Sequence, residues 1–245
     1  MKLWLVRHAK PLVEPGVCYG GLDVPADQHG TRDCAQALAR VLPQGTIVVC
    51  STLQRCEHIA CVLLGLRPDL TYKTDARLKE MDFGDWEGRR WDEIGPAALD
   101  AWVADFASHR PGGGESVQAF MQRVAGVWDE TFAPAASASP AMRAGAHTLW
   151  ITHAGVIRAA TLLHRGVRQI TQAGQWPTAA PGFGECCVLG ACRTWGGDSE
   201  NRPQRGQFLP DLQARSPAMG QEDGEKWTAA VDLQPTIPKS DRLLG

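Results

Sequence analysis

Three short apolar runs of strand length, separated by segments with helical periodicity, constrain the fold of this chain more than any other feature. The runs occupy residues 3–6, 46–50 and 148–152. Between the first two, Cys34, Leu38 and Leu42 fall on one face of a helix expected over residues 30–42. Strands that alternate with helices favour a mostly parallel sheet covered on both faces. We therefore expect an α/β fold, a three-layer α/β/α sandwich with a mostly parallel central sheet.

Cap residues predict where further helices begin and end. Ser51 and Thr52 stand where an N-cap is needed, ahead of an apolar helical pattern that runs to Leu64. Ser116 opens a helix over residues 117–132 in the same way. A last helix is expected over residues 154–163, with Gly166 as its stop.

Composition limits the partners and the location. The chain has 245 residues, a net charge of −2 and a pI near 6.4, so there is no electrostatic reason to expect nucleic acid or an anionic membrane as partner. The first residues do not resemble a signal peptide, and no run approaches the roughly 20 apolar residues of a membrane span. We expect a soluble, cytoplasmic protein. The oligomeric state does not follow from the sequence.

The chain changes character twice. Residues 133–145 are rich in Ala, Ser, Pro and Gly and predict an extended loop. From about Arg193, Pro and Gly interrupt a polar segment that has no sustained periodicity. We expect one domain over residues 1–192 and a Pro/Gly-rich, disordered tail over 193–245. The eight cysteines form no CxxC pair and no zinc-like spacing, which favours reduced thiols in the core.

Two histidines follow two of the strand-like runs directly. Arg7-His8-Ala9 follows residues 3–6, and His153 follows residues 148–152. The carboxyl ends of parallel strands are where ligands bind in such sheets. A neutral imidazole whose other nitrogen is held as a donor can be a nucleophile toward phosphorus, with arginine supplying positive charge. Without further evidence, an Arg-His pair is better explained by a histidine on the protein surface than by a catalytic histidine.

Three further segments fit an anion site. Arg55 falls in the first turn of a helix near the crevice, where its planar fork can grip two phosphate oxygens, although an exposed helical arginine is the default alternative. Residues 78–88 crowd four carboxylates together. A carboxyl there can protonate a leaving oxygen, or the segment can be a solvated acidic loop, and composition does not choose between Glu80 and Asp82. Gly155 allows an anion to approach the next helix, where a protonated His153 would stabilise its charge.

Together these segments resemble the histidine phosphatase superfamily, which includes the cofactor-dependent phosphoglycerate mutases. The resemblance covers roughly residues 2–190 and rests on motifs whose order and spacing match. They are Arg7-His8-Ala9, Ser51-Thr52-Leu53-Gln54-Arg55, Leu78 to Gly88, Gly113-Gly114-Glu115-Ser116 and Thr152-His153. Without the other motifs, residues 111–116 are explained equally well as a loop that ends in an N-cap at Ser116. Ala9 replaces the usual glycine, and Lys10-Pro11 replaces a more common Glu- or Gln-Thr pair.

The resemblance implies a role for each residue. His8 resembles the phosphorylated nucleophile, and Arg7, Arg55 and His153 resemble the rest of the phosphate pocket. Glu80 matches the proton donor of the family, so the catalytic set is His8, Glu80 and His153. The resemblance also implies a phosphoglycerate mutase-like fold and no metal or other cofactor.

The loop Val17 to Pro25 is most similar to the α-ribazole phosphatase branch. We therefore expect a metal-independent phosphomonoesterase that acts on a small-molecule phosphate, with α-ribazole 5′-phosphate of cobalamin biosynthesis as the candidate. A phosphoglycerate mutase, a phosphohistidine protein phosphatase and a non-catalytic phospholigand-binding module are the alternatives. Trp91 and Trp102, in a helical insert, either stack on an aromatic base or pack in the core.

Overall fold

The structure, a computed structural model, describes residues 1–133 and 146–190. Its centre is a five-stranded sheet in the order β3-β2-β4-β1-β5. The strands are β1 (Lys2–Arg7), β2 (Ile47–Cys50), β3 (Thr71–Thr74), β4 (His147–Thr152) and β5 (Cys186–Gly190). The pairs β1–β4, β2–β4 and β2–β3 are parallel, and β5 runs antiparallel to β1. The expected mostly parallel sheet is confirmed.

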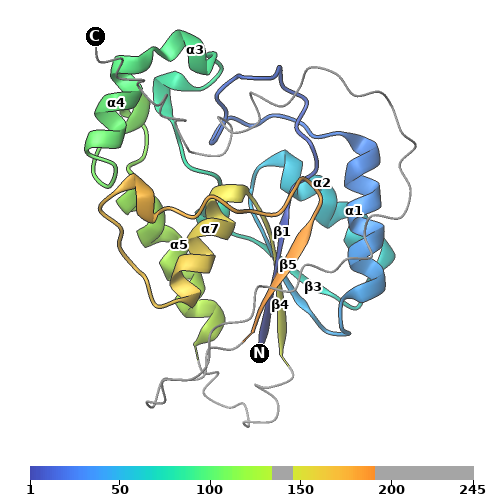
Figure 1. The fold of residues 1–245 in the computed structure, drawn as a ribbon. Coiled ribbons are helices and arrows are strands. Elements are labelled where there is room, and N and C mark those ends of the chain that lie inside the picture. The colour runs from blue at the N-terminus through green and yellow to red at the C-terminus, as the bar shows by residue number, and fades with distance from the viewer. Residues whose placement is uncertain (134–145, 191–245) are drawn as a thin grey trace, which may run out of the picture.

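Helices cover both faces of the sheet, as Figure 1 shows. One face carries α1 (Gln28–Val41) and α2 (Gln54–Leu66), and the other carries α5 (Val117–Phe132) and α7 (Ala154–His164). Two short helices, α3 (Trp91–Ile94) and α4 (Pro96–Ala104), extend beyond the sheet on the side of α5 and α7. The 3₁₀ turns span Ala76–Leu78, Gly84–Trp86, Pro111–Gly113 and Ala173–Gln175. The three-layer sandwich is confirmed.

The two core layers follow from the alternation of side chains along the strands. In β1, Leu3 and Leu5 belong to the cluster under α5 and α7, whereas Trp4 and Val6 belong to the cluster under α1 and α2. Trp150 in β4 joins the first cluster in the same way. All of these side chains are less than 9% exposed. The strand pattern therefore supplies apolar surface to both helical layers.

Most expected boundaries lie within two residues of the observed ones. Ser116 caps α5 by accepting a hydrogen bond from the Ala119 N–H, and Gly166 follows α7 with a φ of 80°. The N-cap predicted at Ser51 or Thr52 is wrong, because α2 begins at Gln54 after Leu53 and has no side-chain cap. The reason is that the Ser51 hydroxyl is used elsewhere, as described below.

Parts of the predicted organisation lie outside the described residues. The tail over 193–245 is outside them entirely, as are residues 134–145 of the predicted loop. The domain boundary at 192 therefore stays a prediction. Of the eight cysteines, seven are described and all seven are free. Five are buried and behave as small apolar side chains, and Cys192 lies outside.

Candidate active site

Parallel pairing of β1 and β4 brings the two histidines together. Arg7 stands opposite Thr152 in the register, and the His8 N–H donates to the Thr152 carbonyl at 3.0 Å. The next residue on each strand is a histidine, and the centroids of the His8 and His153 rings lie 5.1 Å apart. Because β1 continues toward α1 and β4 continues into α7 on the opposite face, the two histidines lie at a topological switch point (Figure 1).

His8 is buried, and one of its ring nitrogens is fixed. Nδ1 lies 2.7 Å from the Ala9 carbonyl oxygen, which can only accept, so Nδ1 carries the proton and donates. The other nitrogen, Nε2, then keeps its lone pair. Burial lowers the pKa of His8 well below its ordinary value, and the nearby Arg55 lowers it further. The geometry therefore presents a neutral imidazole with a nucleophilic Nε2.

His153 is the N-cap residue of α7 and is fully buried. Its Nε2 lies 2.8 Å from the Ser51 hydroxyl and 3.5 Å from the Cys56 sulfur. Its Nδ1 is buried without a hydrogen-bond partner among the described residues. Burial lowers the pKa of His153 well below its ordinary value, and Arg55 adds to this effect. A cation at His153 would need the negative charge of a bound phosphate, so the protonated His153 stays a prediction for the complex with substrate.

The two arginines are buried beside the histidines and tie loops to the site. Arg55 is completely buried, so the exposed-arginine alternative is wrong. Its Nη1 donates to the Leu22 carbonyl at 2.8 Å and its Nη2 to the Gly20 carbonyl at 2.6 Å. Arg7 donates from Nη1 to the Pro181 carbonyl at 3.2 Å. Two buried guanidinium groups therefore supply positive charge where both histidines are neutral.

Glu80 reaches the same site from the loop after β3. It is half-buried; its Oε2 accepts from the Gly155 N–H at 2.9 Å and its Oε1 from the Met81 N–H at 3.0 Å. The Gly155 amide, which we expected to face a bound anion, is therefore occupied by Glu80. A Cβ on Gly155 would lie 2.3 Å from Oε1, so the absence of a side chain there allows this contact.

The other carboxylates of the acidic segment hold turns. Asp82 is exposed, and its Oδ1 accepts from the Gly84 N–H at 2.8 Å. Glu87 accepts from the Phe83 N–H at 2.9 Å and from the Gly21 N–H at 2.7 Å. Asp85 is exposed. Of these four carboxylates, Glu80 lines the pocket that also contains Arg7 and His8. The structure therefore distinguishes Glu80 from Asp82, which the composition of the segment could not do.

The glycine-rich turn of residues 111–116 supports this segment. Gly112 has a φ of 58°, and a Cβ on it would lie 2.2 Å from the Phe83 carbonyl oxygen. A Cβ on Gly114 would lie 2.3 Å from the Asp82 carbonyl oxygen. These glycines therefore permit close backbone packing, and the interpretation as a loop with an N-cap suffices for the glycines and for Ser116.

The two tryptophans of the insert have different surroundings. Trp102 is 1% exposed and stacks on Phe106, so the core interpretation is correct for it. Trp91 is half-buried and lines the pocket with Arg7, His8, Tyr19 and Glu80. Of these two tryptophans, Trp91 lines the pocket and Trp102 does not.

Two residues that the sequence reasoning missed also contact the site. Arg158 of α7 is 1% exposed, lines the pocket, and donates to the Thr178 carbonyl at 2.9 Å. A charged residue inside the apolar run 156–160 was the available signal. Phe183 lies with its ring centroid 5.5 Å from that of His8 and 3.9 Å from the Arg7 guanidinium carbon. No periodicity marks Phe183, because it lies in the irregular segment before β5.

The described residues contain no cluster of three or more His, Cys, Asp or Glu side chains arranged for a metal ion. None of their helices is both long and apolar enough to cross a bilayer.

Comparison with known proteins shows which family this chain resembles. The family model described as histidine phosphatase superfamily (branch 1) matches residues 3–179. The chain is 30% identical to an adenosylcobalamin/alpha-ribazole phosphatase of Salmonella typhimurium over 205 residues, which cover 80% of this chain and 98% of that protein. It is 37% identical to a glucosyl-3-phosphoglycerate phosphatase of Mycobacterium tuberculosis over 121 residues, 47% of this chain and 53% of that protein.

Solved structures share the fold. The complex of a mycobacterial glucosyl-3-phosphoglycerate phosphatase with inorganic phosphate superposes with a TM-score of 0.62 and 24% identity. The superposition covers 77% of this chain and 88% of that chain. At this identity the likeness supports the architecture, and function is argued from the family and the site.

Proposed function

The chain belongs to the histidine phosphatase superfamily (branch 1) and is a phosphatase of small phosphate substrates, and we propose that it works through a phosphohistidine at His8. One observation carries the proposal. His8 holds its proton on Nδ1 and keeps the Nε2 lone pair, in a pocket that also contains Arg7 and Glu80. A neutral nucleophile, fixed positive charge and a carboxyl group are the parts that this hydrolysis needs.

The reaction divides into two balanced steps. In the first, Nε2 of His8 attacks phosphorus, the bond to the ester oxygen breaks, and protonated Glu80 gives its proton to the departing alkoxide. In the second, water attacks the phosphohistidine, Glu80 takes a proton from it, and inorganic phosphate leaves. His8 returns to its starting form. Arg7, Arg55 and the unpartnered Nδ1 of His153 bind the transferring phosphoryl oxygens.

We assign α-ribazole 5′-phosphate, an intermediate of cobalamin assembly, as the substrate. The Salmonella relative, of which this chain covers 98%, is named adenosylcobalamin/alpha-ribazole phosphatase, and this name supports the assignment. Trp91, half-buried in the pocket wall, gives the aromatic base of such a substrate a surface to stack on. Glucosyl-3-phosphoglycerate is the second candidate, because the mycobacterial relative names it and Arg158 offers a further cation for a carboxylate.

A non-catalytic phospholigand-binding module fits less well, because such a module needs no proton donor and both relatives are named as phosphatases. A phosphoglycerate mutase and a phosphohistidine protein phosphatase stay alternatives. The cytoplasmic location and the lack of a nucleic-acid or membrane partner stay predictions.

The test measures phosphate release without added metal from α-ribazole 5′-phosphate, glucosyl-3-phosphoglycerate, 3-phosphoglycerate and p-nitrophenyl phosphate. We expect the highest kcat/KM with α-ribazole 5′-phosphate. A preference for glucosyl-3-phosphoglycerate moves the assignment to the second candidate. Turnover of p-nitrophenyl phosphate alone contradicts both. Rapid quenching into alkali should trap a phosphoenzyme in the wild type and none in His8→Ala; unchanged turnover by His8→Ala would remove His8 from the nucleophile role.

A further inference from the structure

Glu80, the proposed acid, lies on a segment whose backbone carbonyl groups are bound by the side chain of Arg123 in α5. Arg123 faces Glu115, which ends the glycine-rich turn before that helix, and the two side chains are 21% and 17% exposed. Nε of Arg123 donates to Oε1 of Glu115 at 2.7 Å, and Nη2 donates to Oε2 at 2.8 Å. This bidentate pairing fixes the plane and direction of the guanidinium.

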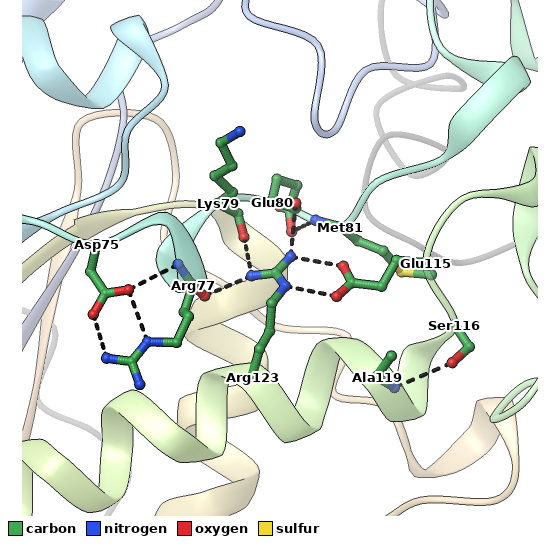
Figure 2. Close-up of polar contacts among 9 residues, drawn as sticks. All are labelled: Asp75, Arg77, Lys79, Glu80, Met81, Glu115, Ser116, Ala119 and Arg123. Carbon is green, nitrogen blue, oxygen red and sulfur yellow. Dashed lines mark hydrogen bonds and ion pairs between the residues drawn. The ribbon is translucent and has the colours of Figure 1, made fainter.

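The remaining donors of Arg123 all go to the main chain around Glu80. Nη1 donates to the carbonyl oxygens of Arg77 at 2.6 Å and Lys79 at 2.8 Å, and Nη2 donates to that of Glu80 at 3.0 Å. Figure 2 shows the guanidinium between this segment and Glu115. An arginine has five N–H donors, and these five bonds use all of them.

Glu80 is therefore held at both ends. Its carbonyl is bound by Arg123, and its carboxylate accepts from the amides of Met81 and Gly155. A shift of the backbone at Glu80 would move the carboxylate away from the first turn of α7. We propose that Arg123, oriented by Glu115, is a positioning residue that sets where Glu80 delivers its proton. This inference rests on the proposed role of Glu80 as the acid.

The neighbouring Arg77 offers a matched control. Its side chain pairs with Asp75 of the same segment at 2.7 Å and with Glu130 of the same helix at 2.6 Å. It is 38% exposed, and none of the hydrogen bonds of its side chain goes to Glu80. Arg77→Met thus removes an arginine that ties the same loop to the same helix, but it leaves all of the Arg123 bonds possible, since these use the Arg77 carbonyl.

The experiment measures kcat/KM for a series of esters, from an activated phenyl phosphate to an alkyl phosphate, in wild type, Arg123→Met, Arg123→Lys and Arg77→Met. An alkoxide needs the proton from Glu80 far more than an activated phenolate does. We expect Arg123→Met to slow the alkyl ester about 10- to 100-fold more than the activated ester. A displacement of a catalytic group by about 1 Å is enough to lower the rate by such a factor. Arg123→Lys should recover part of this loss, and Arg77→Met should slow both esters equally or not at all.

Two outcomes overturn the inference separately from the proposed function. If Glu80→Gln slows the alkyl ester selectively but Arg123→Met slows all esters equally, Glu80 is the acid and Arg123 does not position it. If Glu80→Gln itself shows no selectivity, the proposed role of Glu80 is wrong. In the Glu80→Gln background, Arg123→Met should add no further selectivity, because both changes act through one group. Should Arg123→Met not fold, Arg123→Lys decides, and equal slowing of both esters in it overturns the inference.

Discussion

The carboxylate of Glu80 accepts the backbone N–H of Gly155 at 2.9 Å, and this single contact joins the acidic segment after β3 to the first turn of α7. Because His153 is the N-cap of the same helix, the contact also fixes Glu80 relative to the histidine pair. The place of the proposed acid therefore depends on the backbone of α7 as well as on its own segment.

Gly155→Ala should disturb this contact directly. The new Cβ would lie 2.3 Å from Oε1 of Glu80, a distance that forces the carboxylate to move. We expect a selective loss on alkyl esters of about 10-fold or more, and a cost of about 1–3 kcal/mol in stability from overpacking. Steady-state kinetics with two esters and urea unfolding measure the two effects. Gly174→Ala is the control, since a Cβ there has no neighbour within 4 Å. Equal activity of Gly155→Ala and wild type would show that Glu80 does not need this position.

Ser51→Ala should weaken phosphate binding without selectivity for the leaving group. The Ser51 hydroxyl lies 2.8 Å from Nε2 of His153, and by donating to it leaves Nδ1 as the protonated donor for phosphate. Loss of one such bond is worth about 1 kcal/mol, so we expect kcat/KM to fall roughly 5- to 10-fold for every ester. The inhibition constant of inorganic phosphate should rise by a similar factor. A loss confined to alkyl esters would instead link Ser51 to the acid.

Trp91 and Trp102 should respond oppositely to the same substitution. Trp102 is 1% exposed in the aromatic core, so Trp102→Ala should cost about 3–5 kcal/mol of stability. Trp91 is half-buried in the pocket wall, so Trp91→Ala should raise KM for α-ribazole 5′-phosphate more than for 3-phosphoglycerate, which has no ring to stack. Thermal unfolding and steady-state kinetics of both variants test this pair. Equal changes in KM for the two substrates would contradict the stacking role.

The fold could be largely predicted because its strands and helices have clear local patterns. Residues 3–6 and 148–152 alternate between two buried faces, and the capping of α5 by Ser116 is a local event. The two end strands, β3 and β5, were not predicted. The antiparallel place of β5 beside β1 depends on long-range pairing. The cap of α2 was predicted wrongly because Ser51 bonds a residue 102 positions away.

The residues proposed for the site were all found from motifs, and the structure brings them together. Their chemical roles stay predictions. Arg123 and Phe183 were missed for a physical reason: each acts through contacts with backbone or rings that are distant in sequence, such as the Arg123 bond to the Glu80 carbonyl. Burial lowers the pKa of His153, and the sequence does not show this burial.

The buried histidines should make both activity and stability sensitive to acid. His8 and His153 have folded-state pKa values well below the ordinary value of 6.5, because burial and Arg55 oppose the cation. Below pH 6.5 the unfolded chain therefore binds more protons than the folded one, and the free energy of unfolding falls as pH falls. Each histidine contributes up to about 1.4 kcal/mol per pH unit until its folded pKa is reached. The acid limb of kcat/KM, which requires neutral His8, should likewise lie below pH 6.5.

Urea unfolding of wild type and His8→Gln between pH 7 and pH 5 isolates one histidine. Glutamine does not titrate, so His8→Gln should lose less stability over this range than wild type does, whatever its stability at pH 7. His58→Gln, at an exposed position of α2, is the matched control and should keep the wild-type dependence. An unchanged pH dependence in His8→Gln would mean that His8 protonates as readily in the folded protein as in the unfolded chain. The neutral nucleophile of the proposed mechanism would then lose its structural basis.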